Sequence, residues 1–136
     1  MTTYTLAIYG NHLSELDKAK TLENLGAKLL RTTHSSASYR LFASQDNQAF
    51  LCEDSEDTSE GRKIRVELWE ITADAILQIL QDLGDAYYLK AFYLSDGTAS
   101  LAFLSSLSFC LTENHQEVSR FGGWERYLLK VAEQDA

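Results

Sequence analysis

The stretch Tyr4–Leu13 holds the residues whose types and spacing best suit chemistry. An apolar strand runs into Tyr9-Gly10-Asn11-His12-Leu13, and a helix signal follows directly. A strand that ends in such a loop leaves backbone N–H groups facing one small concavity, which suits a carboxylate or another small anion. His12 is a candidate proton donor beside that anion. The alternative is a plain strand-to-helix connection in which Asn11 takes an unusual dihedral angle and His12 is exposed.

A second candidate group lies where the sequence alternates between residues 64 and 69. Ile64, Val66 and Leu68 fall on one face of an expected strand, and Arg65, Glu67 and Trp69 fall on the other. Glu67 is a candidate general acid or base, provided that an apolar surround favours its protonated form. The alternative is a cross-strand ion pair with an arginine. Trp69 is either a packing residue or a ligand platform.

Two arginines could hold a carboxylate in the bidentate geometry that a guanidinium allows. Tyr39 and Arg40 alternate on an expected strand, so only one of them faces inward, and Arg40 is either a carboxylate clamp or a surface residue. Arg120 is the second candidate. It precedes Phe121-Gly122-Gly123-Trp124, where the glycines either allow close backbone approach to the pocket or form a helix entry anchored by aromatic rings.

Metal and thiol chemistry have little support in the sequence. The three histidines stand alone, without the spacing of a metal site: His12, His34 and His115. One acidic run is typical of a solvated loop, because it lacks the regular oxygen spacing of a calcium loop: Glu53, Asp54, Glu56, Asp57 and Glu60. Cys52 and Cys110 are expected to be buried thiols that form no disulfide and no catalytic nucleophile. We therefore expect no metal and no cofactor.

The composition predicts a folded chain and argues against two classes of partner. The 136 residues carry a net charge of −8 and are 45% hydrophobic, which fits one domain over residues 1–136. Nucleic-acid binding requires a basic face, whereas only Arg62, Lys63 and Arg65 cluster. No apolar run approaches the roughly 20 residues that span a bilayer, and the first residues carry no secretory signal. We expect a cytoplasmic protein that binds neither nucleic acid nor membrane.

Periodicity predicts about three helices and six or seven strands. Ser14 and Asp17 have the form of a capping box for a helix that ends at Gly26. A second helix is expected over residues 72–84 and a third from residue 124. One strand begins at residue 4, and the others are expected at 27–33, 39–43, 49–52, 64–69, 87–94 and 98–104. Residues 112–116 are expected to form a polar connection. This pattern indicates an α+β fold, a small mixed β-barrel that is closed or partly closed.

Several short motifs, taken in order, resemble a known family. Tyr9-Gly10-Asn11 is similar to the carboxylate-holding loop of the gamma-glutamylcyclotransferase-like superfamily, and the wider pattern resembles the C-terminal domain of allophanate hydrolase. The matching pieces cover nearly the whole chain: Gly10-Asn11-His12-Leu13-Ser14, Leu25-Gly26-Ala27, Arg31-Thr32-Thr33, Tyr39–Ala43, Ile64–Glu70, Asp96-Gly97, Phe103-Leu104 and Phe121–Leu128. The resemblance implies a barrel of that superfamily, loop amides that hold a substrate carboxylate, and a role in urea nitrogen metabolism through decarboxylation of N-carboxycarbamate.

Two departures limit which activities the resemblance implies. The cyclotransferases use a glutamate in the helix after the strand with Val and Trp, whereas this chain has Leu80-Gln81-Asp82-Leu83 there. Only Asp82 could replace that carboxylate, and we expect it to be solvated. The Ser-Ser-Lys set of the amidase domain has no counterpart, so we do not expect amide hydrolysis.

The sequence leaves three hypotheses of function open. The first is a stand-alone allophanate hydrolase C-terminal-like domain that binds a small carboxylate or carbamate and promotes decarboxylation. In that hypothesis the loop amides with Arg40 or Arg120 hold the anion, and His12 or Glu67 supplies the proton. The second is a non-catalytic module that forms a homodimer or docks on a separate amidase. The third is a diverged cyclotransferase in which Glu67 serves as the carboxylate.

Overall fold

Eight strands and four α-helices make up the part of the chain that the computed structural model describes, residues 2–14, 16, 18–54, 62–112 and 114–134. The strands are β1 (Thr3–Ile8), β2 (Lys28–His34), β3 (Tyr39–Ser44), β4 (Ala49–Glu53), β5 (Arg65–Thr72), β6 (Tyr88–Tyr93), β7 (Ala99–Leu104) and β8 (His115–Glu117). The helices are α1 (Ala19–Asn24), α2 (Ala73–Leu83), α3 (Leu107–Cys110) and α4 (Trp124–Gln134), with a 3-10 turn η1 (Ser119–Phe121) before the last. The predicted α+β class is confirmed, with more elements than we expected.

The larger sheet has β1 at its centre, in the order β2-β5-β1-β7-β6. β1 runs antiparallel to β5 and parallel to β7. The two edge strands approach each other at one end, where the amide of Ser36 donates to the carbonyl of Tyr93 (3.0 Å) and the amide of Ser95 donates to the carbonyl of His34 (2.9 Å). Because β2 and β6 share no ladder, the sheet curls without closing, so the predicted barrel is only partly formed.

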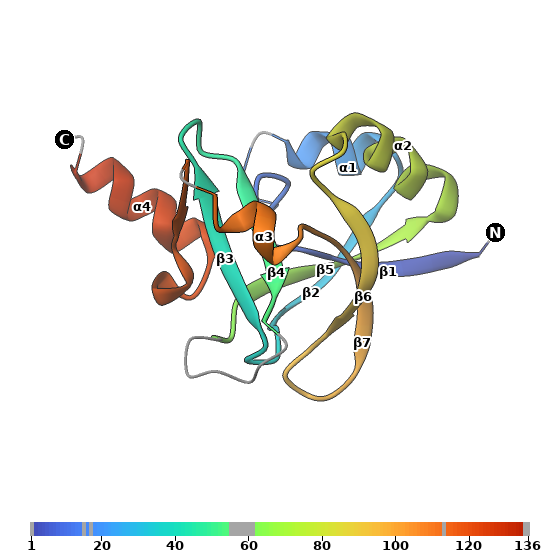
Figure 1. The fold of residues 1–136 in the computed structure, drawn as a ribbon. Coiled ribbons are helices and arrows are strands. Elements are labelled where there is room, and N and C mark those ends of the chain that lie inside the picture. Colours follow the sequence, from blue (N-terminus) through green and yellow to red (C-terminus); the bar gives the residue numbers. More distant parts are fainter. Residues whose placement is uncertain (1, 15, 17, 55–61, 113, 135–136) are drawn as a thin grey trace.

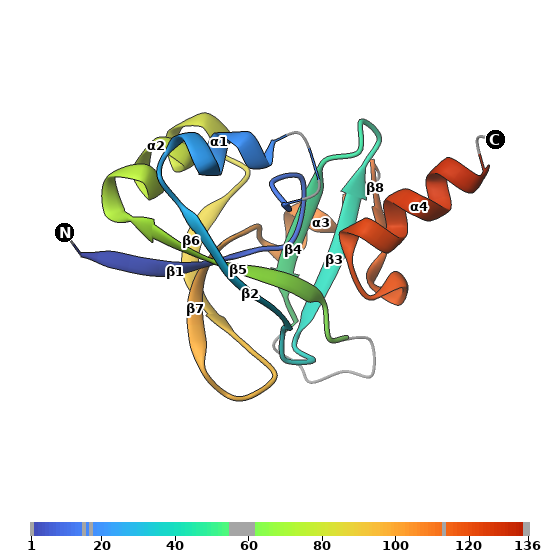
Figure 2. The same cartoon turned by 180° about the vertical axis from the view of Figure 1, so that it is seen from behind.

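The smaller sheet consists of β4, β3 and β8, in that order. It contacts the larger sheet where the amide of Ser105, just after β7, donates to the carbonyl of Leu51 in β4 (2.9 Å). Helix α4 lies beside this sheet, whereas α1 and α2 lie together at the other end of the molecule (Figures 1 and 2). The loop after β1 lies between these two groups of helices.

Helix α2 follows the sequence prediction. The Thr72 hydroxyl accepts a hydrogen bond from the Ala75 amide (3.3 Å) and so caps the helix start. Ile76 and Ile79 are buried on one face of the helix, and Gly84 follows its last residue with a positive φ of 81°. A positive φ favours glycine at such an end.

Helix α1 begins later than predicted, at Ala19 and not after Ser14. The chain from residue 10 onward forms successive turns, in which Leu13 donates to Gly10 (3.0 Å) and Leu16 donates to Leu13 (2.9 Å). Ser14 does not cap the helix, because its amide and hydroxyl both bond to Glu67. Asp17, the other half of the predicted capping box, lies outside the described residues.

Three short elements were not predicted: α3, β8 and the 3-10 turn η1. Helix α3 begins after Ser106, whose hydroxyl accepts a hydrogen bond from the Phe109 amide (3.2 Å). Strand β8 occupies part of the expected polar connection and pairs with β3, Ser44 opposite His115. A strand of three residues is too short to show an alternation, so its partner could be found only from the fold.

Cys52 and Cys110 are both buried and form no disulfide. From the acidic run, Glu53 pairs with Lys90 (2.7 Å) and Asp54 is buried, whereas Glu56, Asp57 and Glu60 lie outside the described residues. Among the residues described, no three His, Cys, Asp or Glu side chains group as a metal site. None of the helices described is both long and apolar enough to cross a bilayer.

Candidate functional site

The loop from Tyr9 to Ser14 is fixed against the β3–β4 hairpin. The Asn11 side chain donates to the carbonyl of Asn47 (3.1 Å) and accepts from the amide of Ala49 (3.0 Å). Gly10 lies so close to this hairpin that a Cβ built on it would be 2.5 Å from the Cβ of Ala49. Gly10 is therefore required here for close approach of the loop to the hairpin.

Glu67 fixes the same loop from the side of β5. Its carboxylate accepts hydrogen bonds from the Ser14 amide (2.7 Å), the Ser14 hydroxyl (2.5 Å) and the Trp69 indole N–H (3.2 Å). The Glu67 side chain is only 2% exposed. The cross-strand ion pair with an arginine is wrong for the residues described, because none of their ion pairs involves Glu67. Trp69 packs in the core and holds Glu67 in place.

A small cavity of about 50 Å³ opens beside this loop. Its polar wall comes from the backbone and side chains of the loop, from Lys18 before α1, and from Gln48 and Tyr87. The remaining wall is apolar and includes Leu83 at the end of α2. Among the described residues, none accepts a hydrogen bond from the amides of Gly10, Asn11 or His12. These amides are therefore available to an anion.

A second cavity of about 210 Å³ adjoins the first and shares His12, Lys18 and Leu83 with it. Asp82 lies on its wall and is solvent-exposed, as we predicted. Together the two cavities form one site, the His12–Lys18 site, in which a cation and an imidazole face the same space. Such a site can hold a carboxylate and place a proton donor beside it.

The environment sets the charge of the side chains around this site. Burial, and then the charge of Lys18, lower the pKa of His12 below its ordinary value of 6.5. His12 is therefore neutral near pH 7 and carries one N–H. Burial raises the pKa of the hydroxyls of Tyr87 and Tyr9. Both hydroxyls donate to backbone carbonyls, those of Ala49 (2.7 Å) and Phe103 (2.5 Å), so neither tyrosine is a base at neutral pH.

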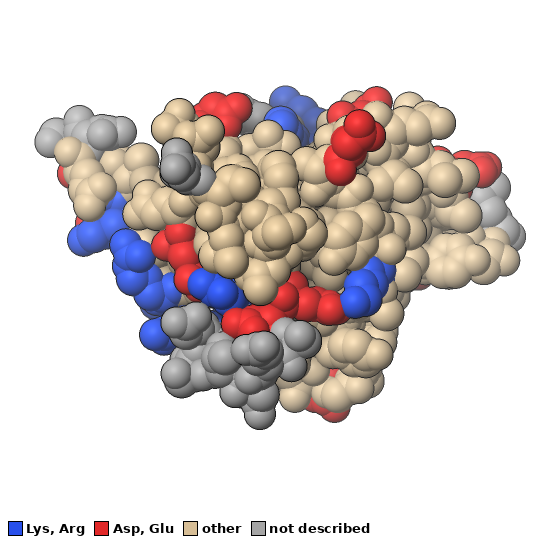
Figure 3. Space-filling model, in the orientation of Figure 1, with Lys and Arg blue, Asp and Glu red and all other residues tan. Residues whose placement is uncertain are grey.

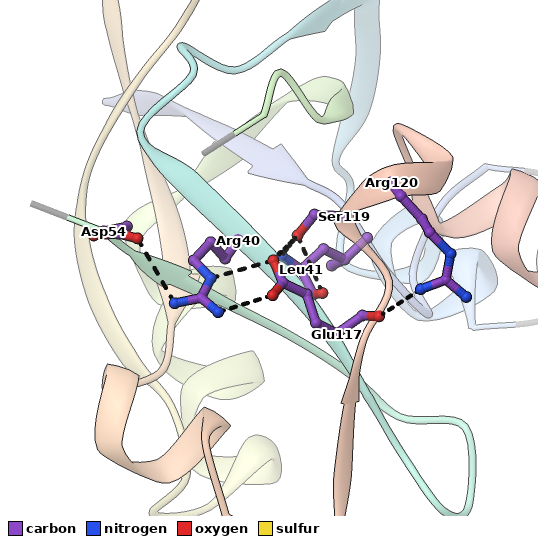
Figure 4. Close-up of polar contacts among 6 residues, drawn as sticks. All are labelled: Arg40, Leu41, Asp54, Glu117, Ser119 and Arg120. Atoms are coloured by element: carbon purple, nitrogen blue, oxygen red, sulfur yellow. Dashed lines mark hydrogen bonds and ion pairs between the residues drawn. The ribbon is translucent and has the colours of Figure 1, made fainter. Parts of the chain in front are cut away.

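Arg40 does not reach the His12–Lys18 site. It lies on β3 with its side chain 12% exposed, and it bonds to both carboxylate oxygens of Glu117, the shorter contact being 2.8 Å (Figure 4). Its guanidinium also pairs with Asp54 at 3.7 Å. Ser119 completes the group, because its hydroxyl donates to Glu117 (2.8 Å) and accepts from the Leu41 amide (2.8 Å). Arg40 thus has two carboxylate partners within the chain itself. The contacts of Arg40 and Ser119 tie β8 and η1 to β3.

Six other predicted binding residues also lie away from this site, Phe121 among them. Tyr39 is buried, and its hydroxyl accepts from the amide of Tyr93 (2.9 Å). Arg120 stacks over Phe121, 4.5 Å from the ring centroid, and donates to the carbonyl of Glu117 (3.3 Å). Gly122 takes a positive φ of 77° and ends η1. Leu13 and Trp69 are buried, Leu13 on the side of the loop that faces α4.

The structure therefore brings together Tyr9, Gly10, Asn11 and His12 with residues that sequence reasoning missed. Lys18, Gln48 and Tyr87 carry no motif, and their positions on the cavity wall depend on turns and strand pairings distant in sequence. One signal was present for Lys18, since it follows the loop directly and its charge suits an anion site. Gln48 and Tyr87 are linked to each other by a hydrogen bond of 3.1 Å.

The comparison with protein families decides where this fold belongs. The family model of the allophanate hydrolase C-terminal domain matches residues 4–129. The chain belongs to this family. No curated protein matches it. The sequence-based recognition of the allophanate hydrolase C-terminal domain is thus confirmed over most of the chain.

Solved structures show the same fold at low sequence identity. The chain is 23% identical to c4763, a uropathogenic E. coli-specific protein, with a TM-score of 0.84 over 94% of this chain and 97% of that one. It is 18% identical to K. lactis urea amidolyase, with a TM-score of 0.87 over 96% of this chain and 8% of that one. A gamma-glutamyl cyclotransferase is 14% identical, with a TM-score of 0.55 over 85% of this chain and 70% of that one. Allophanate hydrolase C-terminal domains and the cyclotransferase therefore share this architecture, and the chain spans a small part of the urea amidolyase.

Proposed function

We propose that this allophanate hydrolase C-terminal domain binds a small carboxylate or carbamate in the His12–Lys18 site and promotes decarboxylation of N-carboxycarbamate. The observation that carries the proposal is the placement of an imidazole and an ammonium group beside loop amides that have no acceptor among the described residues. Lys18 and the amides hold one carboxylate of the substrate. The urea amidolyase similarity supports the choice of substrate class.

The reaction needs a proton where the C–N bond breaks. When that bond breaks, its electron pair stays on nitrogen, carbon dioxide leaves, and one proton converts the remaining fragment into carbamate. His12 supplies this proton as imidazolium and becomes neutral imidazole. Apolar wall residues such as Leu83 and Phe103 leave the departing carboxylate poorly solvated, which favours loss of its charge. Since the pKa of His12 is lowered, the fraction of imidazolium rises as the pH falls, and we expect the decarboxylation rate to rise with it.

Binding is tested by thermal melting with malonate, a stable analogue with CH₂ in place of NH. At a hundredfold excess over its Kd, a ligand of the native state adds about 2.7 kcal/mol to stability. We expect the shift in wild type and its loss in Lys18→Met. Lys20→Met is the matched control, because Lys20 is an exposed lysine of α1 outside both cavities. No shift with malonate, or equal shifts in both variants, would refute binding at this site.

Chemistry is tested by supplying allophanate together with a separately purified amidase and following ¹³C-labelled carbamate by NMR. The domain should increase the rate of carbamate formation, and His12→Asn should remove the increase while the malonate shift remains. A domain that binds malonate without changing the rate would refute decarboxylation and leave binding standing.

A docking role is the second candidate function, and one observation favours it. The edge strand β2 exposes Leu29 and Leu30, the latter to 51%, and Leu30 is the extra residue of a bulge between Leu29 and Arg31 in the pairing with β5. An unpaired edge with exposed leucines is a surface on which a second copy or an amidase could add a strand. Light scattering of wild type and Leu30→Lys, alone and with the amidase, tests this role. A monomer that ignores the amidase would contradict it.

A further inference from the structure

The chain has two cysteines, Cys52 in β4 and Cys110 at the end of α3, and the function proposed above uses neither of them. Both side chains are 0% exposed, and both are free thiols. The thiol of Cys110 donates a hydrogen bond to the sulfur of Cys52. Two thiols that are distant in sequence are thus in contact in the fold.

The pairing of β3 with β4 determines which way Cys52 faces. Arg40 lies directly opposite Cys52, and Phe42 lies directly opposite Phe50. Because side chains two residues apart in a strand share a face, these four side chains lie on one side of the hairpin. The Arg40 guanidinium lies over the Phe42 ring, 5.4 Å from its centroid, which agrees with this placement. Cys52 therefore has a largely buried cation as its neighbour.

Helix α3 packs on this side of β4 and brings Cys110 to Cys52 (Figure 1). The ring of Phe109 meets the ring of Phe50 edge-on, with the two centroids 5.0 Å apart. Phe109 and Cys110 are adjacent in the chain, and Phe50 and Cys52 are neighbours on one face of β4. An aromatic contact and a thiol contact therefore hold α3 against the same face.

The surroundings make Cys52 the more acidic thiol of the pair. The hydrogen bond from Cys110 lowers the pKa of Cys52 most, burial opposes this effect, and the charge of Arg40 lowers the pKa further. The carboxylates of Glu117 and Asp54 act in the opposite direction but do not reverse the shift. In Cys110 the same hydrogen bond, followed by burial, raises the pKa. Because the thiolate is the nucleophile in thiol oxidation, Cys52 is the sulfur that reacts first.

The helix that carries Cys110 is a single turn at the surface. It spans only Leu107–Cys110, and Leu111 after it is 55% exposed. Residues 106–112 carry no charged side chain, and Figure 3 shows a largely uncharged surface where α3 lies. Opening of α3 breaks no ion pair of the described residues, since none of these pairs includes residues 106–112. Short surface segments of this kind open locally at little cost in free energy, and such opening admits a small neutral oxidant.

We propose that Cys52 and Cys110 are a redox modification site, at which hydrogen peroxide converts the two thiols into a disulfide while the domain stays folded. The Cys52 thiolate attacks one oxygen of the peroxide, the O–O bond breaks, and the hydroxide that leaves takes up the proton that Cys52 has lost. The sulfur of Cys110 then attacks the sulfur of the Cys52 sulfenic acid, the S–O bond breaks, and the second hydroxide leaves with the Cys110 proton as water. Two thiols and one peroxide thus give one disulfide and two waters.

The test exposes the reduced, folded protein to hydrogen peroxide and counts the remaining thiols by mass spectrometry after labelling with N-ethylmaleimide in denaturant. We expect both labels to be lost together and to return after treatment with dithiothreitol. In Cys52→Ser and Cys110→Ser the single thiol should instead gain oxygen up to sulfinic acid, which dithiothreitol does not reverse. A wild type that keeps both thiols, gains oxygen in place of the bridge, or links two chains would overturn the proposal.

Two helix-cap variants decide whether the disulfide forms in the folded protein. Ser106→Ala removes the hydroxyl that caps α3 (3.2 Å), and Thr72→Ala removes the corresponding cap of α2 (3.3 Å). Both changes lower the global stability by a similar amount, but only the first favours opening of α3. Oxidation should be about fivefold faster in Ser106→Ala and within about twofold of wild type in Thr72→Ala. Equal rates in the two variants would show that α3 does not control access to the thiols, and this result would overturn the proposal.

Discussion

Replacing Gly10 by alanine tests the contact that places the candidate loop. The new Cβ would be 2.5 Å from the Cβ of Ala49, whereas methyl groups in contact are normally about 4 Å apart. The loop and β4 must therefore move apart by more than about 1 Å, which is most of the difference between these two distances. Gly10 has no positive φ, so steric contact and not backbone strain determines the effect.

The expected loss combines two opposing effects. Overpacking of this kind costs about 1–3 kcal/mol. Alanine also restricts the unfolded chain, which returns about 0.4–1 kcal/mol of stability. We therefore expect Gly10→Ala to lower the free energy of unfolding by about 1–2 kcal/mol.

Ala49→Gly removes the opposing methyl group and provides the matched second mutation. Alone it should cost about 1–2 kcal/mol, since it removes a buried methyl group and places glycine in a strand. In the double variant the methyl group at position 10 takes the vacated space. The double variant should therefore be more stable than the sum of the single losses by about 1–3 kcal/mol.

Urea unfolding followed by tryptophan fluorescence measures all four proteins, because Trp69 and Trp124 are both buried. The urea dependence of the unfolding free energy should stay constant across the set. If the single losses add to within about 0.5 kcal/mol, the loop does not touch the hairpin at this point. The described packing of the candidate site would then be wrong.

Four further outcomes follow from groups around the loop and the smaller sheet. Glu67→Ala leaves one buried and two partly buried donors without an acceptor, and urea unfolding should show a loss of about 2–4 kcal/mol; a loss below about 1 kcal/mol would contradict the bonding. Arg40→Met leaves two carboxylates without their cation and should cost about 3 kcal/mol in the same assay; a neutral change would contradict the buried pairing. Burial opposes ionisation of Glu117, but hydrogen bonds from Arg40 and Ser119 outweigh it and lower its pKa below the ordinary 4.5. The ionised Glu117 carboxylate therefore stabilises the fold above pH 4.5, and this stabilisation is lost as the pH falls through its lowered pKa. Glu117→Gln should make the free energy of unfolding fall less steeply as the pH is lowered. An unchanged dependence on pH would refute this. Lys18→Met should raise the pKa of His12 in an NMR titration, since it removes a nearby positive charge, and no change would mean that Lys18 lies elsewhere.

Local sequence signals predicted most of the regular elements. The Thr72 cap and the following apolar stripe located α2, and Asp96-Gly97 located the β6–β7 hairpin, because these signals act within a few residues. The start of α1 was misplaced for the opposite reason. Ser14 has the chemistry of a cap, but Glu67, distant in sequence, takes both of its polar groups. Tertiary bonding here overrides a local preference.

The candidate site was predicted only in the part that is contiguous in sequence. Residues 9–12 form its wall as expected, since one loop carries them. Arg40 has the chemistry of a carboxylate clamp, but its carboxylate is Glu117, which a single sequence cannot pair with it. Lys18 reaches the cavity through the turns after β1, and Tyr87 reaches it from its position just before β6. Such placement depends on the whole fold.

The central position of β1 in the larger sheet has a consequence for how the protein is made. β1 precedes the other described strands of this domain, yet its neighbours are β5, with Leu6 opposite Trp69, and β7, with Leu6 opposite Leu101. β1 does not pair with β2, the strand that follows it in the chain, so it stays without a partner until β5 is complete at Thr72. Pairings over such sequence separations form slowly. Nascent chains that stop before residue 65 should therefore lack both strands that pair with β1 and be the species that chaperones and proteases bind.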